Sequence, residues 1–469
     1  MFARLVRLDI ANLLRDRRLA ATLTAFSAVF ALAGIAAWRE VQAAAETKAA
    51  VAEAERQRWL SQGERDPHTA AHYSIYAFKP SLALQAVDAG IVPFVGEAVW
   101  LEAHLQNDLL FRPQQDATVF ERLGLVDPAG LFVRFAPLAV FLLAFAAAAR
   151  ERELGVLGLA LGMAPTRSAY LGAKVASVAG LGVLATVVPI VAIGALSTAT
   201  NPSGSAEQAG RLAGWAAGAV AYVAIMSTIA VSICALARSV QVACSALVFA
   251  WVALVLAALP AASAVAEWSR PLPSFQEMKL VLVDEAPAYW TPESGAEQIA
   301  TILRQYGAPD VDALAAKQIN VRGAQLDLAE RRAQAVFDRE ISGFYDRLAD
   351  QDRAYARLGW LSPAIAFDVA SAALTGTDFT HHRDFIDAAE RYRRALVNRL
   401  NSDLIPKPAV GGREHTNNAD LWSQVPAFEY MPLPLSTGVA PSLAALAALV
   451  CWLAGGAALV AHSATHVRP

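Results

Sequence analysis

Six apolar runs, each long enough to cross a lipid bilayer, constrain this chain more than any other feature of its sequence. A membrane-spanning helix needs about 20 predominantly apolar residues, because the hydrocarbon core is about 30 Å thick. The mean hydropathy is +0.37, and the 56% share of hydrophobic residues exceeds the roughly 45–50% of ordinary soluble domains. The sequence therefore predicts an all-α polytopic membrane protein with six transmembrane helices, at residues 19–38, 131–149, 175–197, 212–236, 240–265 and 439–461.

Lys and Arg residues gather on one side of the predicted spans, which identifies that side as cytoplasmic. They stand in the N-terminal segment 1–18, which has an amphipathic helical pattern, in the loop 150–174, at Arg238 and in the tail 462–469. Both termini are therefore predicted to be cytoplasmic. A cleaved signal peptide is the alternative for the N-terminus, but the first apolar run exceeds the roughly 7–15 residues of a signal-peptide core.

Two long segments fall on the opposite, external side. Residues 39–130 contain alternating aromatic and polar residues at 73–80 and a second candidate strand at 98–104, so we expect a small mixed α/β insertion there. Residues 266–438 are expected to form a larger, mainly helical insertion.

A helical hairpin is the main feature expected in the larger insertion. Apolar residues recur at three- and four-residue steps over 336–358 and again over 385–400. The two apolar faces would pack together, with residues 375–378 in the connection.

Sequence signatures of enzymes are missing. The chain has no G-x-x-x-x-G-K-[ST] phosphate loop, no H-E-x-x-H zinc motif and no G-x-S-x-G elbow. We therefore expect no ATPase or other catalytic site in this chain, and no basic stripe suggests a nucleic-acid partner. The cysteines Cys234, Cys244 and Cys451 all fall inside predicted spans, so no external disulfide is expected.

Histidines of the external segments form one constellation that could hold a metal ion. Adjacent histidines on a helix point in different directions, so the favoured interpretation is a solvated helix start with Asp378 as its N-cap and no bound metal. The residues weighed are His381, His382, Asp378 and Asp384, joined by His68, His72 and His104 from the first segment.

Small residues in the fourth predicted span can admit a neighbouring helix. Gly214 and Gly218 form a small-xxx-small pair, a pattern that lets two helix backbones approach closely. Helix packing is the role expected for both.

A charged loop separates the second and third predicted spans. It begins Arg150-Glu151-Arg152-Glu153. The glycines and the proline that follow predict a short, separate helix along the membrane, which another protein could bind. Simple membrane-interface charges are the alternative interpretation.

At this loop the sequence resembles the permease subunits of bacterial ATP-binding-cassette transporters of the type-2 exporter class. Val156 and Gly158 depart from the usual pattern. Segments such as 92–96 and 361–364 are similar to the subfamily with two large external insertions. The loop residues that match are Arg150, Glu151, Glu153, Gly155, Leu157, Pro165, Arg167, Gly172 and Lys174.

The resemblance implies a half-transporter of the bacterial inner membrane that pairs with a second copy or a sister permease and binds cytoplasmic ATPase subunits. ATP and magnesium would be bound by those subunits. The resemblance does not identify the transported substrate. A membrane sensor or scaffold that uses its external helices without transport is the alternative, although it usually needs a cytoplasmic effector domain. The residues implied in ATPase coupling are Arg150, Glu151, Arg152, Glu153, Gly155, Leu157, Pro165 and Arg167.

Overall fold

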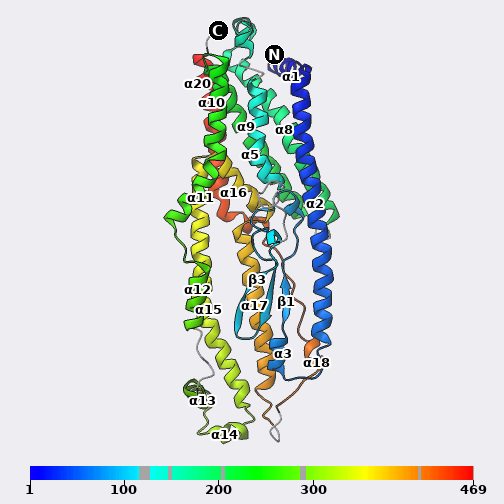
Figure 1. Cartoon of the computed structure of the whole chain (residues 1–469), viewed down its shortest axis with the longest axis vertical. Coiled ribbons are helices and arrows are strands. Elements are labelled where there is room, and N and C mark those ends of the chain that lie inside the picture. Colours follow the sequence, from blue (N-terminus) through cyan, green and yellow to red (C-terminus); the bar gives the residue numbers. More distant parts are fainter. Residues whose placement is uncertain (116–126, 146–149, 202–205, 286–291, 410–413, 468–469) are drawn as a thin grey trace.

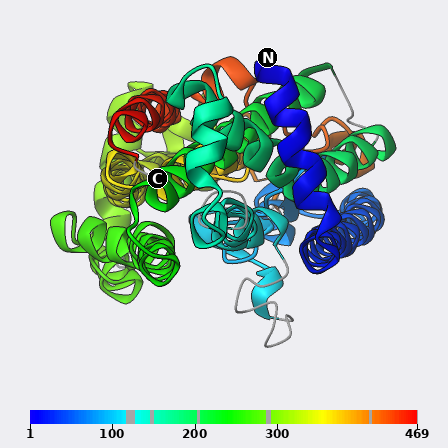
Figure 2. The same ribbon diagram turned by 90° about the horizontal axis from the view of Figure 1, so that it is seen from above.

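The molecule is elongated (Figure 1), and the helices apolar enough to cross a membrane lie toward one end, while the sheet and the more polar helices lie toward the other. Both chain termini lie at the apolar end, and α1 (Phe2–Arg15) lies across that end (Figures 1 and 2). The computed structural model describes residues 1–115, 127–145, 150–201, 206–285, 292–409 and 414–467.

Five helical stretches among the described residues are long and apolar enough to cross a membrane, which makes this a mostly helical, multi-pass type of chain. The second predicted span, 131–149, coincides with the shorter apolar helix α5 (Pro128–Ala144), and its last residues, 146–149, lie outside the described ranges. The five stretches are α2 (Arg17–Leu60), α8 (Arg167–Thr200), α9 (Ala206–Leu236), the run Val240–Ser269 and the run Leu435–His466.

Two of these stretches are composite. The run Val240–Ser269 consists of α10 (Val240–Trp251), the π-helical turn η4 (Val252–Leu256) and α11 (Ala258–Ser269). The run Leu435–His466 consists of α19 (Leu435–Gly438), η6 (Ala440–Ser442) and α20 (Leu443–His466).

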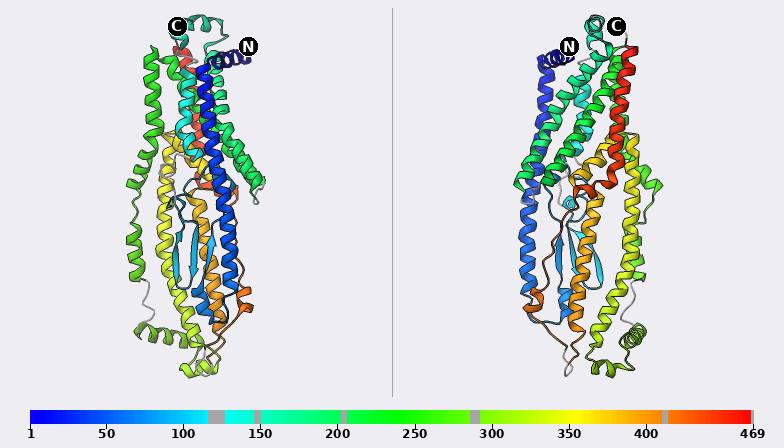
Figure 3. Two further views of the ribbon diagram at one scale, coloured as in Figure 1. Left: turned by 45° about the vertical axis from the view of Figure 1, so that its right-hand side comes forward. Right: turned by 180° about the vertical axis from the view of Figure 1, so that it is seen from behind.

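Helix α2 runs without interruption from the apolar end far into the polar end (Figure 3). Asp16 ends α1 and caps α2, because its carboxylate accepts the backbone N–H of Arg18 at 3.0 Å. The helix has 44 residues, so it is about 66 Å long, twice the thickness of the hydrocarbon core. The predicted first span and the helical continuation after it are thus one rigid element.

The chain between the two predicted hairpin helices enters the apolar core, which corrects the expectation of a direct helical hairpin. Helices α15 (Val321–Arg357) and α17 (Phe379–Leu404) do pack together, but η5 (Leu358–Trp360) and α16 (Pro363–Thr375) stand between them. Helix α16 packs against α5, α9 and α20.

Local chemistry explains both ends of α16. Pro363 occupies the first turn, and the hydroxyl of Ser362 accepts the backbone N–H of Ala364 at 3.1 Å. The left-handed Gly376, with φ of +79°, ends the helix. Phe367 carries the helix into the core, where its ring lies 5.3 Å from those of Phe132 and Tyr222.

A three-stranded antiparallel sheet lies in the polar end, in the order β1 (Ile75–Phe78), β2 (Ala98–Glu102) and β3 (Leu105–Leu110). The strands predicted over 73–80 and 98–104 are confirmed as β1 and β2. The tight turn at Ala103 and His104 returns the chain as β3, which the sequence analysis did not identify. Helix α3 (Pro67–Tyr73), α17 and α2 pack around the sheet.

Six further helices are described outside the loop 150–174. They are η1 (Ala83–Ala86), η2 (Pro113–Gln115), α12 (Phe275–Glu285), α13 (Pro292–Tyr306), α14 (Val311–Ala316) and α18 (Ala419–Ser423).

The segments 39–130 and 266–438 share one hydrophobic core. Trp59 of α2 and Trp422 of α18 are fully buried, and their rings meet edge to face with centroids 6.0 Å apart. The indole N–H of Trp59 donates to the carbonyl oxygen of Trp422 at 2.9 Å. This contact fixes the far end of α2 to the segment that leads back toward the last apolar helix.

Candidate functional sites

The charged loop forms two short helices at the apolar end of the molecule, beside the termini (Figures 1 and 3). They are α6 (Arg150–Glu153) and α7 (Leu157–Met163). Gly155, with φ of +68°, makes the turn between them in a conformation that other residues rarely adopt. Thr166 then caps α8 by accepting the backbone N–H of Ala169 at 3.0 Å.

A buried lysine ties this loop to two other elements. Lys174 of α8 donates to Glu151 of α6 at 2.7 Å and to Asp9 of α1 at 2.5 Å, with a side chain only 7% exposed. The hydroxyl of Tyr170 also donates to Glu151. Burial raises the pKa of Asp9, and the charge of Lys174 opposes this rise. The network fixes α6 to α8 and α1.

Two arginines of the loop bind helix ends at their carbonyl groups. Arg152 donates to the carbonyl oxygens of Ala235 at 3.0 Å and Cys234 at 3.2 Å, near the C-terminus of α9. Arg167 donates to the carbonyl oxygen of Val467 at 3.3 Å. These carbonyls have no further helical turn to bond with, so the arginines hold α9 and the chain end to the loop.

The outer surface of the loop is apolar and exposed. Leu154 is 64% exposed, and Leu159 and Met163 of α7 are 68% and 66% exposed. Leu157 instead points inward and is 4% exposed. Arg150 begins α6, and its side chain lies outside the part of the chain that the structure describes. The other loop residues named from the sequence, Glu153, Gly155 and Pro165, are exposed.

The paired glycines of α9 lie against α16. A Cβ atom on Gly214 would lie 2.9 Å from Cδ2 of Leu374, and one on Gly218 would lie 3.5 Å from the ring of Phe367. Their missing side chains therefore give α16 its place against α9.

His381 and His382 are buried, so the expected solvated helix start is wrong. The N-cap itself is confirmed, because the carboxylate of Asp378 accepts the backbone N–H of His381 at 3.1 Å. The exposures of 2% and 4% arise because α17 begins beneath the last apolar run, where a Cβ on Gly438 would touch His381. Asp384 accepts the hydroxyl of Tyr430 at 2.8 Å.

Two buried basic groups face each other at the start of α17. Nζ of Lys79 lies 3.5 Å from Nδ1 of His382. Burial and the lysine charge lower the pKa of His382 to about 3. Burial and the charge of Lys48 lower the pKa of Lys79 to about 8. His382 is therefore neutral at pH 7.

The other three weighed histidines come together away from His381 and His382. His68, His72 and His104 each offer one ring nitrogen, and these atoms lie within 4.8 Å of one another. Burial, with the neighbouring rings, lowers the pKa of His68 to about 4 and also lowers that of His72.

A cavity of about 900 Å³ lies between the apolar end and the polar end. Its wall includes residues of α2, α15, α16 and the chain around residues 85–97. Acidic side chains concentrate on this wall, among them Asp88, Asp127 and Asp368, with Arg134 of α5 beside them.

Each of these acids has a defined hydrogen-bond donor. Asp127 accepts the backbone N–H of Gly130 at 2.6 Å, and Asp368 accepts the hydroxyl of Tyr355 at 3.0 Å. Asp88 accepts the hydroxyl of Ser371. Burial, together with Asp127 as its charged neighbour, raises the pKa of Asp88 well above its usual range. The sequence analysis missed this cluster, although an aspartate within the apolar helix 363–375 is a signal for it.

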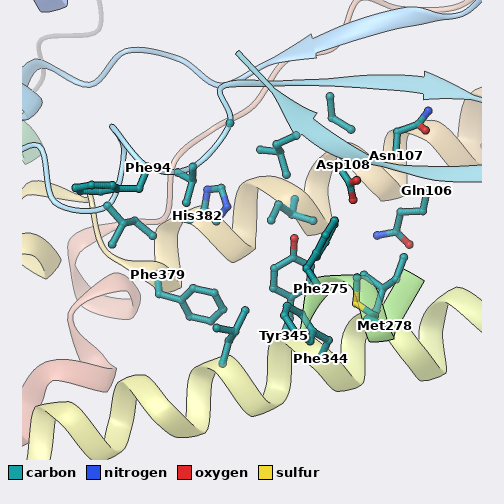
Figure 4. A pocket seen from close by; sticks show the side chains of 18 of the residues that line it. Phe94, Gln106, Asn107, Asp108, Phe275, Met278, Phe344, Tyr345, Phe379 and His382 are labelled. Atoms are coloured by element: carbon teal, nitrogen blue, oxygen red, sulfur yellow. The ribbon is translucent and has the colours of Figure 1, made fainter. Parts of the chain in front are cut away.

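A second cavity, of about 600 Å³, extends between the sheet, α12, α15 and α17 (Figure 4). Phe275, Phe344, Tyr345 and Phe379 lie around it, with Asp108 among the polar residues of the sheet side. The two cavities adjoin, because they share six lining residues, which are Ile91, Phe94, Arg112, Asp352, Tyr355 and Phe379. Together they offer a large aromatic space that continues into an acidic one.

Comparison with known proteins finds a family match for only part of the chain. Residues 291–431 match the family model described as a domain of unknown function, DUF3526. That segment includes α15, α16 and α17. No curated protein and no solved structure matches the chain. The matched description names no activity, so a functional conclusion has to come from the geometry.

Proposed function

We propose that this chain is a membrane-spanning permease subunit of an ATP-driven transporter, an exporter of the bacterial inner membrane with both termini in the cytoplasm. The observation that carries the proposal is the α6–α7 loop, which is apolar on its outer surface and fixed to α8 through Glu151 and Lys174. Exposed apolar side chains on a rigidly anchored element are typical of a docking surface. The partner is a separate cytoplasmic ATPase, which supplies the ATP and magnesium site.

The anchors of the loop give a path for mechanical coupling. A force on α7 reaches α8 through the Glu151–Lys174 ion pair and α9 through the hydrogen bonds of Arg152. Both helices pack against elements that line the cavity between the two ends of the molecule, α8 against α5 and α9 against α5 and α16. Their relative movement would change that cavity, in the way that sliding or tilting of packed helices transmits other conformational changes.

Specific contacts join α8 and α9 to the cavity wall. Ser197 of α8 donates to the carbonyl oxygen of Ala83 at 2.7 Å, in η1, which leads to Asp88. Trp215 of α9 donates to the hydroxyl of Ser371 at 2.7 Å, and that hydroxyl donates to Asp88. Asp88 is thus held from both helices, and the adjoining cavities are the proposed place for cargo.

Co-purification tests the proposal. The tagged chain is purified in mild detergent as wild type, as Glu153→Arg and as Leu159→Glu, and vanadate-sensitive ATPase activity is measured in each preparation. We expect wild type to retain an ATPase subunit and both loop variants to lose it. Glu46→Arg, at an exposed position on α2 outside the apolar run, is the matched control and should retain it.

A wild-type preparation without any ATPase would favour the alternative, a sensor or scaffold that works through its extramembrane helices. Retention of the ATPase by both loop variants would instead contradict the docking role of α7. A second tag, on a co-expressed copy of the chain, distinguishes self-association from pairing with a sister permease.

A further inference from the structure

Three histidines from two separate elements converge at the surface of the polar end. Nε2 of His68 lies 3.2 Å from Nε2 of His72 and 3.3 Å from Nε2 of His104. A tetrahedral zinc ion with Zn–N bonds of about 2.0–2.1 Å holds its ligand nitrogens about 3.3–3.4 Å apart. Both nitrogen–nitrogen separations are close to this value.

The local fold prepares this convergence. Asp66 caps α3 by accepting the backbone N–H of Thr69 at 2.9 Å, and Pro67 follows it in the first turn. His68 and His72 are four residues apart, so they lie on the same face of α3. His104 comes from the β2–β3 turn, where it adopts φ of +65°, a conformation uncommon for a side-chain-bearing residue.

The opposite nitrogens of two rings face oxygen acceptors. Nδ1 of His104 lies 3.4 Å from a carboxylate oxygen of Glu330, and Nδ1 of His68 lies 3.4 Å from Oδ1 of Asn401. Glu330 also accepts the backbone N–H of His104 at 3.0 Å. Carboxylate or amide oxygens behind a histidine are the usual outer partners of a metal-binding imidazole.

One outer partner also sets which nitrogen of His68 is available to a metal ion. Nδ1 of His68 is hydrogen-bonded to Oδ1 of Asn401, so the ring proton lies on Nδ1 and Nε2 keeps its lone pair. That lone pair faces the Nε2 atoms of His72 and His104. A cation placed between the three rings would be coordinated by it.

We propose that His68, His72 and His104 bind one divalent transition-metal ion, with zinc the best match. Imidazole nitrogens suit zinc and copper and are poor ligands for calcium or magnesium. His72 is the exposed member of the group, so the ion can enter from solvent and its ring can rotate to complete the set. Three protein ligands leave a fourth position for water or for a donor atom of another molecule.

Zinc titration of the full chain in detergent tests the site. The metal-stripped protein is titrated with zinc against a chromophoric chelator, as wild type and as His72→Ala, His104→Ala and the double variant. We expect one zinc ion per wild-type chain and, on loss of either ligand, binding weaker by on the order of 100-fold. X-ray absorption at the zinc edge should report three nitrogen neighbours at about 2.0–2.1 Å.

The C-terminal tail provides a matched control. His462 and His466 are also four residues apart, with ring centroids 4.2 Å apart, but no third histidine joins them among the described residues. The variant with both changed to alanine should bind zinc as wild type does. The proposal is overturned if zinc binding survives in the His72→Ala/His104→Ala variant or disappears in the tail variant. Thermal unfolding without metal checks that all variants are folded.

Discussion

Lys174 donates to Glu151 at 2.7 Å across the junction between α8 and the short helix α6. The same ammonium donates to Asp9 of α1, so one buried cation serves two carboxylates from different elements. The α6–α7 loop, the N-terminal helix α1 and the long apolar helix α8 thus meet at one side chain. In the proposed transporter this is the point at which a force on the loop enters the bundle.

Replacement of Glu151 by glutamine should therefore weaken the loop without unfolding the chain. Lys174 keeps Asp9 as a charged partner, so we expect a loss of about 1.5–3 kcal/mol in the free energy of unfolding, the usual contribution of one charge-assisted hydrogen bond. Thermal unfolding in detergent measures the loss. Glu153→Gln, at the exposed neighbouring position, should stay within about 0.5 kcal/mol of wild type.

A double-mutant cycle with Lys174→Met separates the ion pair from general disturbance of the loop. Equal losses for Glu151→Gln in the presence and absence of the lysine would contradict the role of the pair.

Gly214 gives a test of how α16 is held against α9. A larger side chain there meets Leu374 of α16, so Gly214→Leu should lower the free energy of unfolding by about 1–3 kcal/mol, the usual cost of overpacking. Gly210 lies one turn away on α9 with open space around it, so Gly210→Leu should be neutral or slightly stabilising. Addition of Leu374→Ala should restore part of the stability lost by Gly214→Leu, whereas failure to do so would place the strain elsewhere.

Apolar runs long enough to cross a membrane, and the alternation typical of strands, could be recognised in the sequence because each pattern depends on residues close together in the chain. The apolar runs predicted five long helices and α5, the aromatic alternation predicted β1, and the second candidate strand corresponds to β2. Helix α16 was missed because its 13 residues are too few for a span and its role depends on the distant α9 and α20. An apolar stretch of that length is compatible with several environments.

The candidate sites divide in the same way. The loop residues were found from local pattern, but their division into inward anchors, such as Glu151 and Arg152, and outward residues, such as Leu159, needs the tertiary fold. The histidines were weighed as one group because sequence order cannot tell which turn meets which helix. The fold selects His104 as the partner of α3 and buries His382 beside Lys79.

His382 predicts a pH dependence of stability. Its folded pKa of about 3 lies below the ordinary value of 6.5, so folded protein keeps the ring neutral while the unfolded chain takes up a proton. Stability from this group is present above pH 6.5 and is lost as the pH falls toward 3. At pH 5 the loss is about 2 kcal/mol relative to pH 7.

Thermal unfolding of wild type and His382→Gln at pH 7 and pH 5 measures this effect. The variant should lose less stability between the two pH values, whatever its stability at pH 7. A wild-type-like pH difference in His382→Gln would mean that the buried ring does not carry the effect.

Asp88 predicts a pH dependence of stability of the opposite sign to that of His382. Burial and the nearby Asp127 raise its folded pKa, so the folded chain holds this proton more tightly than the unfolded chain. Its contribution to stability is greatest at low pH and is lost as the pH rises from about 4 through the raised pKa. Asp88→Asn removes the titrating group but keeps an oxygen to accept the N–H of Gly90. The variant should therefore unfold at a higher temperature than wild type at pH 8, by an amount that shrinks toward pH 5.

Asp312→Asn, at an exposed site on α14, should leave the pH profile of the unfolding temperature unchanged. If Asp88→Asn instead destabilises the chain equally at both pH values, the ionised carboxylate is compensated in the cavity, and Arg134 becomes the residue to vary next.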